Sequence, residues 1–67
     1  MDNKLRTTIG QNIVTEFGDK YGHDESNSRD VISDICHYMA YQGLTIEQIK
    51  SELDLAYRNF EDEVTGV

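Results

Sequence analysis

The spacing of apolar residues over the last third of this chain constrains its fold more than any other feature. Seven apolar side chains recur there at short helical steps: Ile46, Ile49, Leu53, Ala56, Tyr57, Phe60 and Val64. This period predicts an amphipathic helix over residues 46–63. Thr45 is suited to cap it, because Gln48 completes a capping box and because Leu44 and Ile49 are placed for a hydrophobic staple.

A second apolar face precedes this helix. Its members are Val31, Ile32, Ile35, Cys36 and Met39. Residues 26–28 offer several N-caps, and Gly43 suits the left-handed position after a helix, so we expect a helix over residues 28–42. The link to the next helix is very short, which predicts a tight helix-Gly-helix corner.

The N-terminal third carries a mixed signal. Five apolar residues are spaced by four: Leu5, Ile9, Ile13, Phe17 and Tyr21. This spacing favours a helix over residues 3–17, whereas Gly10 and several β-branched residues oppose it. A strand over residues 12–17 is the alternative, but a lone strand would leave its backbone groups unpaired. Residues 18–27 are rich in turn formers and predict a loop.

These elements together predict an all-α fold, a small three-helix domain spanning residues 1–67. A chain of 67 residues has room for one domain, and one of this size buries only about 60% of its unfolded surface.

Cys36 is the only cysteine, which excludes an internal disulfide and suits a reducing cytosol. The N-terminus lacks the apolar region of a signal peptide, and no apolar run reaches membrane-spanning length. We therefore expect a cytoplasmic protein with no membrane partner.

Charge contradicts the motif that the corner resembles. Residues 43–49 read like the turn and second-helix start of a helix-turn-helix. The helix they open carries six acids against Lys50 and Arg58, and the whole chain has 13 acids, 6 bases and a formal charge of −7. A helix that lies against phosphates needs the opposite sign. We expect no direct binding to nucleic acid, and a protein partner with a basic surface instead.

The residues that invite a metal or catalytic interpretation do not meet the requirements of those sites. The acids of residues 19–30 lack the ligand spacing of a calcium loop, and adjacent Cys36 and His37 point about 100° apart on a helix. His37 shares one exposed helix face with Ser33, Asp34 and Tyr41, where no cleft excludes water. We expect no catalytic residue, no metal, no cofactor and no enzymatic activity.

The candidate binding residues are those that helical wheels place off the apolar faces. We predict a partner-binding set of Asp30, Asp34, His37, Tyr41, Glu47, Asp54, Leu55 and Glu61. His37 and Tyr41 are amphipathic groups that interfaces favour. Leu55 breaks the pattern of its helix, which indicates either an ordinary exposed leucine or a contact with a partner or a second copy.

One family resemblance follows from these residues. The run Asp30-Val31-Ile32-Ser33-Asp34-Ile35-Cys36-His37-Tyr38, then Gly43, then Ala56-Tyr57-Arg58-Asn59-Phe60-Glu61, resembles a pattern in small proteins of phages and plasmids. It covers roughly the last 38 residues and implies a two-helix unit in an accessory protein of a mobile element, without catalytic residues. Size and acidity are also similar to those of phage inhibitors of host defence, such as anti-CRISPR and anti-restriction proteins, some of which imitate DNA.

We therefore expect a small acidic protein-binding module. The resemblance implies a mobile-element protein that inhibits or modulates a nucleic-acid-handling protein in the host cytoplasm. The first alternative is a self-associating assembly module, a homodimer that uses Leu55 and the tyrosines. The second is a degenerate helix-turn-helix regulator.

Overall fold

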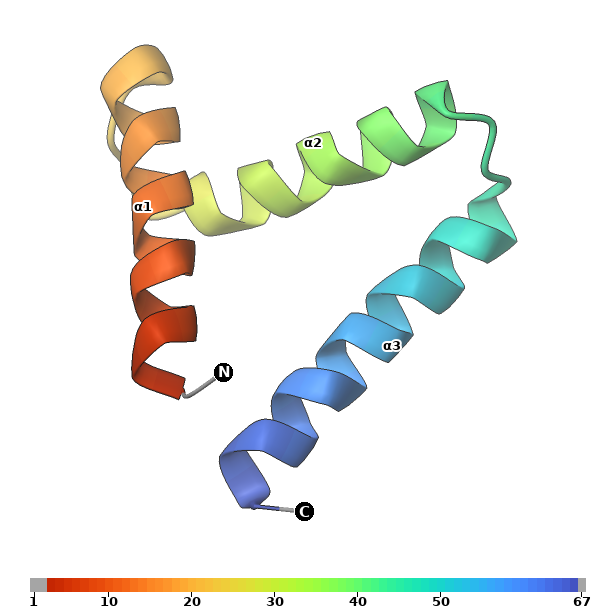
Figure 1. Ribbon diagram of the computed structural model, residues 1–67. Coiled ribbons are helices and arrows are strands. Elements are labelled where there is room, and N and C mark those ends of the chain that lie inside the picture. Colours follow the sequence, from red (N-terminus) through yellow and green to blue (C-terminus); the bar gives the residue numbers. More distant parts are fainter. Residues whose placement is uncertain (1–2, 67) are drawn as a thin grey trace. The chain divides into compact units, whose positions relative to one another are not determined.

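The computed structural model describes residues 3–66, which form three α-helices and no strand (Figure 1). Helix α1 spans Asn3–Tyr21, α2 spans Asn27–Tyr41 and α3 spans Ile46–Thr65. The predicted all-α, three-helix class is confirmed. The chain divides into two compact units, the first ending at Ile35 and the second beginning at Cys36. Each unit is described by itself below.

Helix α1 forms in spite of its glycine and β-branched residues, and the alternative of a strand over residues 12–17 is wrong. Two of its threonines bond back to the preceding turn. The Thr7 hydroxyl donates to the carbonyl of Asn3 at 2.8 Å, and the Thr8 hydroxyl donates to the carbonyl of Lys4 at 3.1 Å. These bonds satisfy hydroxyls that would otherwise compete with the helix for backbone groups.

Helix α1 continues four residues beyond the predicted end, so the prediction of a loop from residue 18 is wrong at its start. The rings of Phe17 and Tyr21 lie one helical turn apart with centroids 5.0 Å from each other, which stabilises the last turn. The helix stops at Gly22, whose φ of 105° is open to glycine and whose amide donates to the carbonyl of Gly18 at 2.8 Å.

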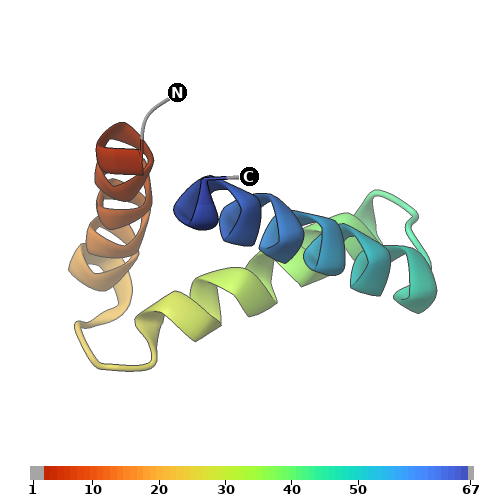
Figure 2. The ribbon, with the colours of Figure 1, turned by 90° about the horizontal axis from the view of Figure 1, so that it is seen from below.

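The loop between α1 and α2 is short, as Figure 2 shows. Asn27, the first residue of α2, is only 4% exposed, and its side-chain amide donates to the carbonyl of Gly22 at 3.0 Å. The carbonyl of Ser26 accepts from the amide of Asp30 at 2.9 Å, the first bond of the helix. Helix α2 therefore begins and ends one residue earlier than predicted.

The corner between α2 and α3 follows its prediction closely. Gly43 has a φ of 100° and its amide donates to the carbonyl of Ala40 at 3.0 Å. The amide of Leu44 donates to the carbonyl of Met39 at 3.1 Å. This pair of bonds is a Schellman motif, which satisfies carbonyls that the end of α2 leaves free.

The start of α3 carries the predicted capping box. The amide of Gln48 donates to the Thr45 hydroxyl at 3.1 Å, and the amide of Thr45 donates to the Gln48 side-chain oxygen at 2.8 Å. The helix ends two residues later than predicted, where the amide of Gly66 donates to the carbonyl of Asp62.

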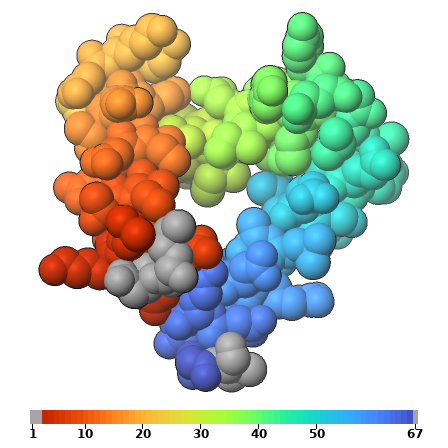
Figure 3. All heavy atoms as spheres, viewed as in Figure 1, coloured from red at the N-terminus to blue at the C-terminus, as the bar shows by residue number. Residues whose placement is uncertain are grey.

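The apolar stripes exist on the helices, but no hydrophobic side chain among residues 3–66 is buried. On α3, Tyr57 is 64% exposed, Phe60 is 56% exposed and Val64 is 53% exposed. Figure 3 shows the heavy atoms of the chain from one side, with α3 in teal to blue. The expected compact packing is therefore not present within either unit. Each unit has fewer than about 40 residues, a length at which a chain seldom builds its own core.

Candidate protein interface

The clearest functional feature in the structure is a row of carboxylates along α3. Glu47, Asp54 and Glu61 recur every seven residues, which brings them to one side of the helix at axial intervals of about 10.5 Å. All three are exposed. Glu47 also lies in the first turn, where a negative charge is favourable beside the helix N-terminus. The structure thus brings these three predicted site residues together.

Two bases of α3 lie on the same face as this row. Lys50 and Arg58 are exposed, and each is three or four residues from two of the acids, so they offset part of the charge of the row. Three further acids occupy the helix: Glu52, Asp62 and Glu63. The helix therefore keeps a strong negative charge over its whole length, which attracts basic partners and repels phosphates.

Leu55 is 50% exposed, as predicted, but the exposure does not distinguish it. Apolar residues of the α3 stripe, such as Tyr57 and Phe60, are at least as exposed. Exposure alone therefore does not single out Leu55, because the stripe itself has no cover within its unit. The helical period of the apolar residues in the sequence could have identified this stripe as a second exposed surface of α3.

Asp30 has a local structural role that the sequence interpretation missed. It is half-buried, and its carboxylate lies 3.0 Å from the Ser26 hydroxyl, whose single proton it shares with the Asp24 carboxylate. A carboxylate in the first turn of a helix is stabilised by the free amides there. Asp34, one turn further along, is exposed. Asp30 is therefore less available to a partner than Asp34.

His37 and Tyr41 are both exposed on α2, and Tyr41 is 84% exposed. Within the described part of the chain, the His37 side chain takes part in no hydrogen bond or ion pair. No hydrogen bond therefore links His37 to an acid that would orient it, as a Ser-His-Asp mechanism requires. Both side chains are available as amphipathic contact groups.

The predicted site residues fall in both units. Asp30 and Asp34 lie in the first, whereas the others lie in the second: His37, Tyr41, Glu47, Asp54, Leu55 and Glu61. The second unit alone therefore carries three acids, two aromatic rings and one leucine of the predicted set.

The loop acids between α1 and α2 are engaged in local hydrogen bonds. The Asp24 carboxylate accepts from the amide of Ser26 at 2.7 Å and from its hydroxyl. The bond from the Ser26 hydroxyl, followed by the bond from its amide, holds the pKa of Asp24 below its ordinary value of 3.8; desolvation opposes these bonds, and the charge of Arg29 lowers the pKa a little further. The His23 ring lies 2.8 Å from the Asp19 carboxylate. No group of three or more metal-ligating side chains occurs among residues 3–66.

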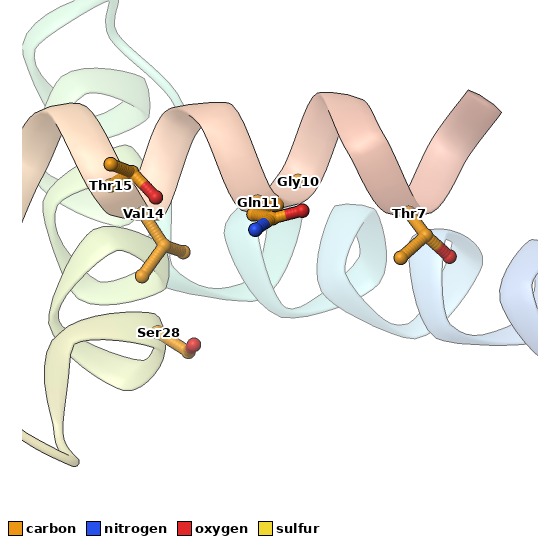
Figure 4. A pocket seen from close by; sticks show the side chains of 6 residues that line it. All are labelled: Thr7, Gly10, Gln11, Val14, Thr15 and Ser28. Carbon is orange, nitrogen blue, oxygen red and sulfur yellow. The ribbon is translucent and has the colours of Figure 1, made fainter. Parts of the chain in front are cut away.

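A hollow on the first unit is lined by small and uncharged side chains (Figure 4). Thr7, Gly10 and Gln11 form one end of it on α1, and Val14 points toward Ser28 at the start of α2. Its lining contains no titratable group and no nucleophile beside a base. This hollow therefore offers no chemistry of its own.

None of the described helices is both long and apolar enough to cross a membrane. Comparisons of the chain with protein-family models, curated proteins and solved structures found no match. The candidate interface therefore stands on the geometry of its own residues.

Proposed function

We propose that this protein is a small acidic binding module that docks on a basic, normally nucleic-acid-facing surface of another protein. The observation that carries the proposal is the exposed row of Glu47, Asp54 and Glu61 on α3. Lys and Arg clusters that bind phosphates are complementary to such a row. His37 and Tyr41 supply contacts at the same interface that are less sensitive to salt.

The spacing of the row supports this choice of partner. Each strand of B-DNA carries one phosphate per about 3.4 Å of helix axis, so the axial interval of about 10.5 Å between the acids equals about three phosphate steps along that axis. Successive phosphates also turn about the duplex, so the correspondence is in axial spacing alone. The imitation of DNA is partial, because the row has only three carboxylates and corresponds to one strand of a duplex.

The biological setting is part of the same proposal. An acidic module of this size suits an accessory protein of a phage or plasmid that inhibits or modulates a nucleic-acid-handling protein in the host cytoplasm. The formal charge of −7 on 67 residues supports it, together with the resemblance carried by residues 30–61. A helix-turn-helix regulator is disfavoured, because α3 would bring six acids toward phosphates. We propose no catalytic role.

The test measures capture of nucleic-acid-binding proteins from a bacterial lysate on the immobilised chain. The unmodified chain should retain such proteins, and added duplex DNA should displace them because it competes for the same basic site. The triple variant Glu47→Gln, Asp54→Asn, Glu61→Gln should bind roughly 3- to 160-fold more weakly, since each of the three surface charges contributes about 0.2–1 kcal/mol. Binding should also weaken as salt rises.

The matched control changes the same number of charges elsewhere. Glu16, Glu25 and Glu52 are exposed and lie off the row, so the triple variant Glu16→Gln, Glu25→Gln, Glu52→Gln has the same net charge. It should keep most of the binding. Equal losses of binding in the two triple variants would show that only the net charge matters. Binding that neither added DNA nor the α3 substitutions weaken would contradict the proposal.

A further inference from the structure

One face of α3 carries charges of alternating sign. Five side chains form this charge ladder, at successive steps of three, four, four and three residues: Glu47, Lys50, Asp54, Arg58 and Glu61. At about 100° and 1.5 Å per residue, these steps keep the ladder within an arc of about 80° and spread it over about 21 Å of the helix. The two bases therefore stand between the acids of the row, and the same face presents both signs of charge to a partner.

The members of the charge ladder are available to a partner. All five are exposed, and among residues 3–66 none of their side chains takes part in a hydrogen bond or ion pair. Opposite charges three or four residues apart on an exposed helix attract each other only weakly. The charged groups of a partner can therefore exchange for these neighbours at little cost.

The alternation of sign decides which partner surfaces this face accepts. A continuous run of bases sets some bases opposite the acids of the row and others opposite Lys50 and Arg58, where like charges repel each other. A surface that sets a carboxylate opposite each of these two bases pairs with all five members of the ladder. The steps and the signs read the same from both ends of α3, so a complementary helix can run in either direction.

We infer that Lys50 and Arg58 are specificity-determining residues of the interface, which select partners that carry carboxylates between their bases. This inference rests on the function proposed above and narrows its partner. Nucleic-acid-facing sites that hold metal ions or read cytosine carry carboxylates among their bases, whereas sites that contact only phosphate do not need them. The partner is therefore a protein with a mixed site of this kind, and surfaces made of bases alone bind less well.

Two synthetic helical peptides of identical composition test this selection. Each carries three lysines and two glutamates. In the first peptide the two residue types alternate at the steps of the charge ladder, and in the second the three lysines precede the two glutamates. Fluorescence anisotropy of the labelled peptides gives both affinities at low salt, where exposed charges are screened least. The unmodified chain should bind the alternating peptide about 2- to 30-fold more tightly, the range expected for two exposed ion pairs.

Substitutions of the two bases show whether they cause the preference. The double variant Lys50→Gln, Arg58→Gln should lose most of it and should bind the second peptide more tightly than the unmodified chain does. The matched control is Lys4→Gln, Lys20→Gln, which removes two exposed bases of α1, has the same net charge and should keep the preference. The exchange Lys50→Arg, Arg58→Lys keeps both charges and should behave like the unmodified chain. Far-UV circular dichroism of each variant verifies that its helices are intact.

Equal affinities of the unmodified chain for the two peptides would overturn the inference. A preference that survives in the Lys50→Gln, Arg58→Gln variant, or that the α1 control also loses, would overturn it too. The peptides and the lysate capture fail separately. A chain that retains DNA-displaced proteins without preferring the alternating peptide loses this inference alone, whereas a chain that prefers this peptide but captures nothing contradicts the proposed function.

Discussion

The two connections between the helices end their preceding helix in the same way and hold the next one differently. Gly22 and Gly43 have φ values of 105° and 100°. Gly22 directly follows Tyr21, the last residue of α1, and Gly43 lies two residues after Tyr41, the last residue of α2. After Gly43, the Schellman bonds and the capping box occupy a few consecutive residues. After Gly22, side chains reach across the loop: Asn27 bonds to the backbone of Gly22, and His23 returns to Asp19. The corner is thus held by backbone bonds at Gly43 and Leu44 and by a capping box within four residues, whereas in the loop side chains bond to residues four or five positions away.

This difference predicts that the loop is most sensitive at Asn27. The Asn27→Ala change should lower the free energy of unfolding by about 1–3 kcal/mol, because it removes a buried donor and leaves the Gly22 carbonyl without that partner. Thermal unfolding followed by far-UV circular dichroism measures the loss. The neighbouring exposed residue supplies the control, and Ser28→Ala should have a much smaller effect. Equal effects would show that the loop does not depend on the Asn27 bond.

The corner should instead be sensitive at its glycine. The Gly43→Ala change should cost about 1–2 kcal/mol, because a Cβ is strained at a positive φ even where the space around it is open. Asparagine tolerates left-handed conformations better, so Gly43→Asn should cost less than Gly43→Ala. Urea unfolding gives both values. A neutral Gly43→Ala variant would contradict the backbone explanation of the corner.

Substitutions of two glycines inside α1 should change the free energy of unfolding by a smaller amount than those at Asn27 and Gly43. Gly10→Ala should stabilise the helix by about 0.5–1 kcal/mol, because nothing lies within 4 Å of the added Cβ. A Cβ on Gly18 would lie 2.2 Å from Nδ1 of His23, so the ring must move away and lose its contact with Asp19. Gly18→Ala should therefore gain less than Gly10→Ala. The same gain in both, measured by thermal unfolding, would show that His23 does not need the space.

The smallest expected effect is a pH dependence of the same loop. Because folding lowers the pKa of Asp24, its contribution to stability is present above its unfolded pKa of about 3.9 and is lost as pH falls through the lower folded pKa. The Ser26→Ala change removes the hydroxyl donor, so it should raise the pKa of Asp24. A carboxyl titration by NMR measures the midpoint in both proteins. An unchanged midpoint would contradict the assignment of the shift to Ser26.

Short-range patterns explain which parts of the fold were predictable. The Thr45–Gln48 box, the Gly43 terminus and the three helices each depend on residues within a few positions, so the sequence predicts them. The end of α1 was misplaced by four residues because the Phe17–Tyr21 contact outweighs the usual turn preference of Gly18 and Asp19. Helical periodicity also identifies an apolar face without saying whether anything covers it. For this reason the stripe of α3 was expected to be packed.

Part of the candidate interface was also predictable from the sequence. Helical spacing alone places Glu47, Asp54 and Glu61 on one exposed face. The engagement of Asp30 with Ser26 could not be read from spacing, because the Ser26 hydroxyl has several other possible acceptors at a helix start. Leu55 was singled out because it breaks the pattern of the stripe, but Tyr57 and Phe60 of the stripe are at least as exposed, so exposure does not distinguish it.

Capture by the two matched triple variants tests most directly whether the acidic row of α3 carries the binding. The unmodified chain should retain nucleic-acid-binding proteins that duplex DNA displaces, and the triple variant Glu47→Gln, Asp54→Asn, Glu61→Gln should lose much of that capture. The triple variant Glu16→Gln, Glu25→Gln, Glu52→Gln should keep most of it. Equal losses in the two variants would contradict the assignment of binding to the row.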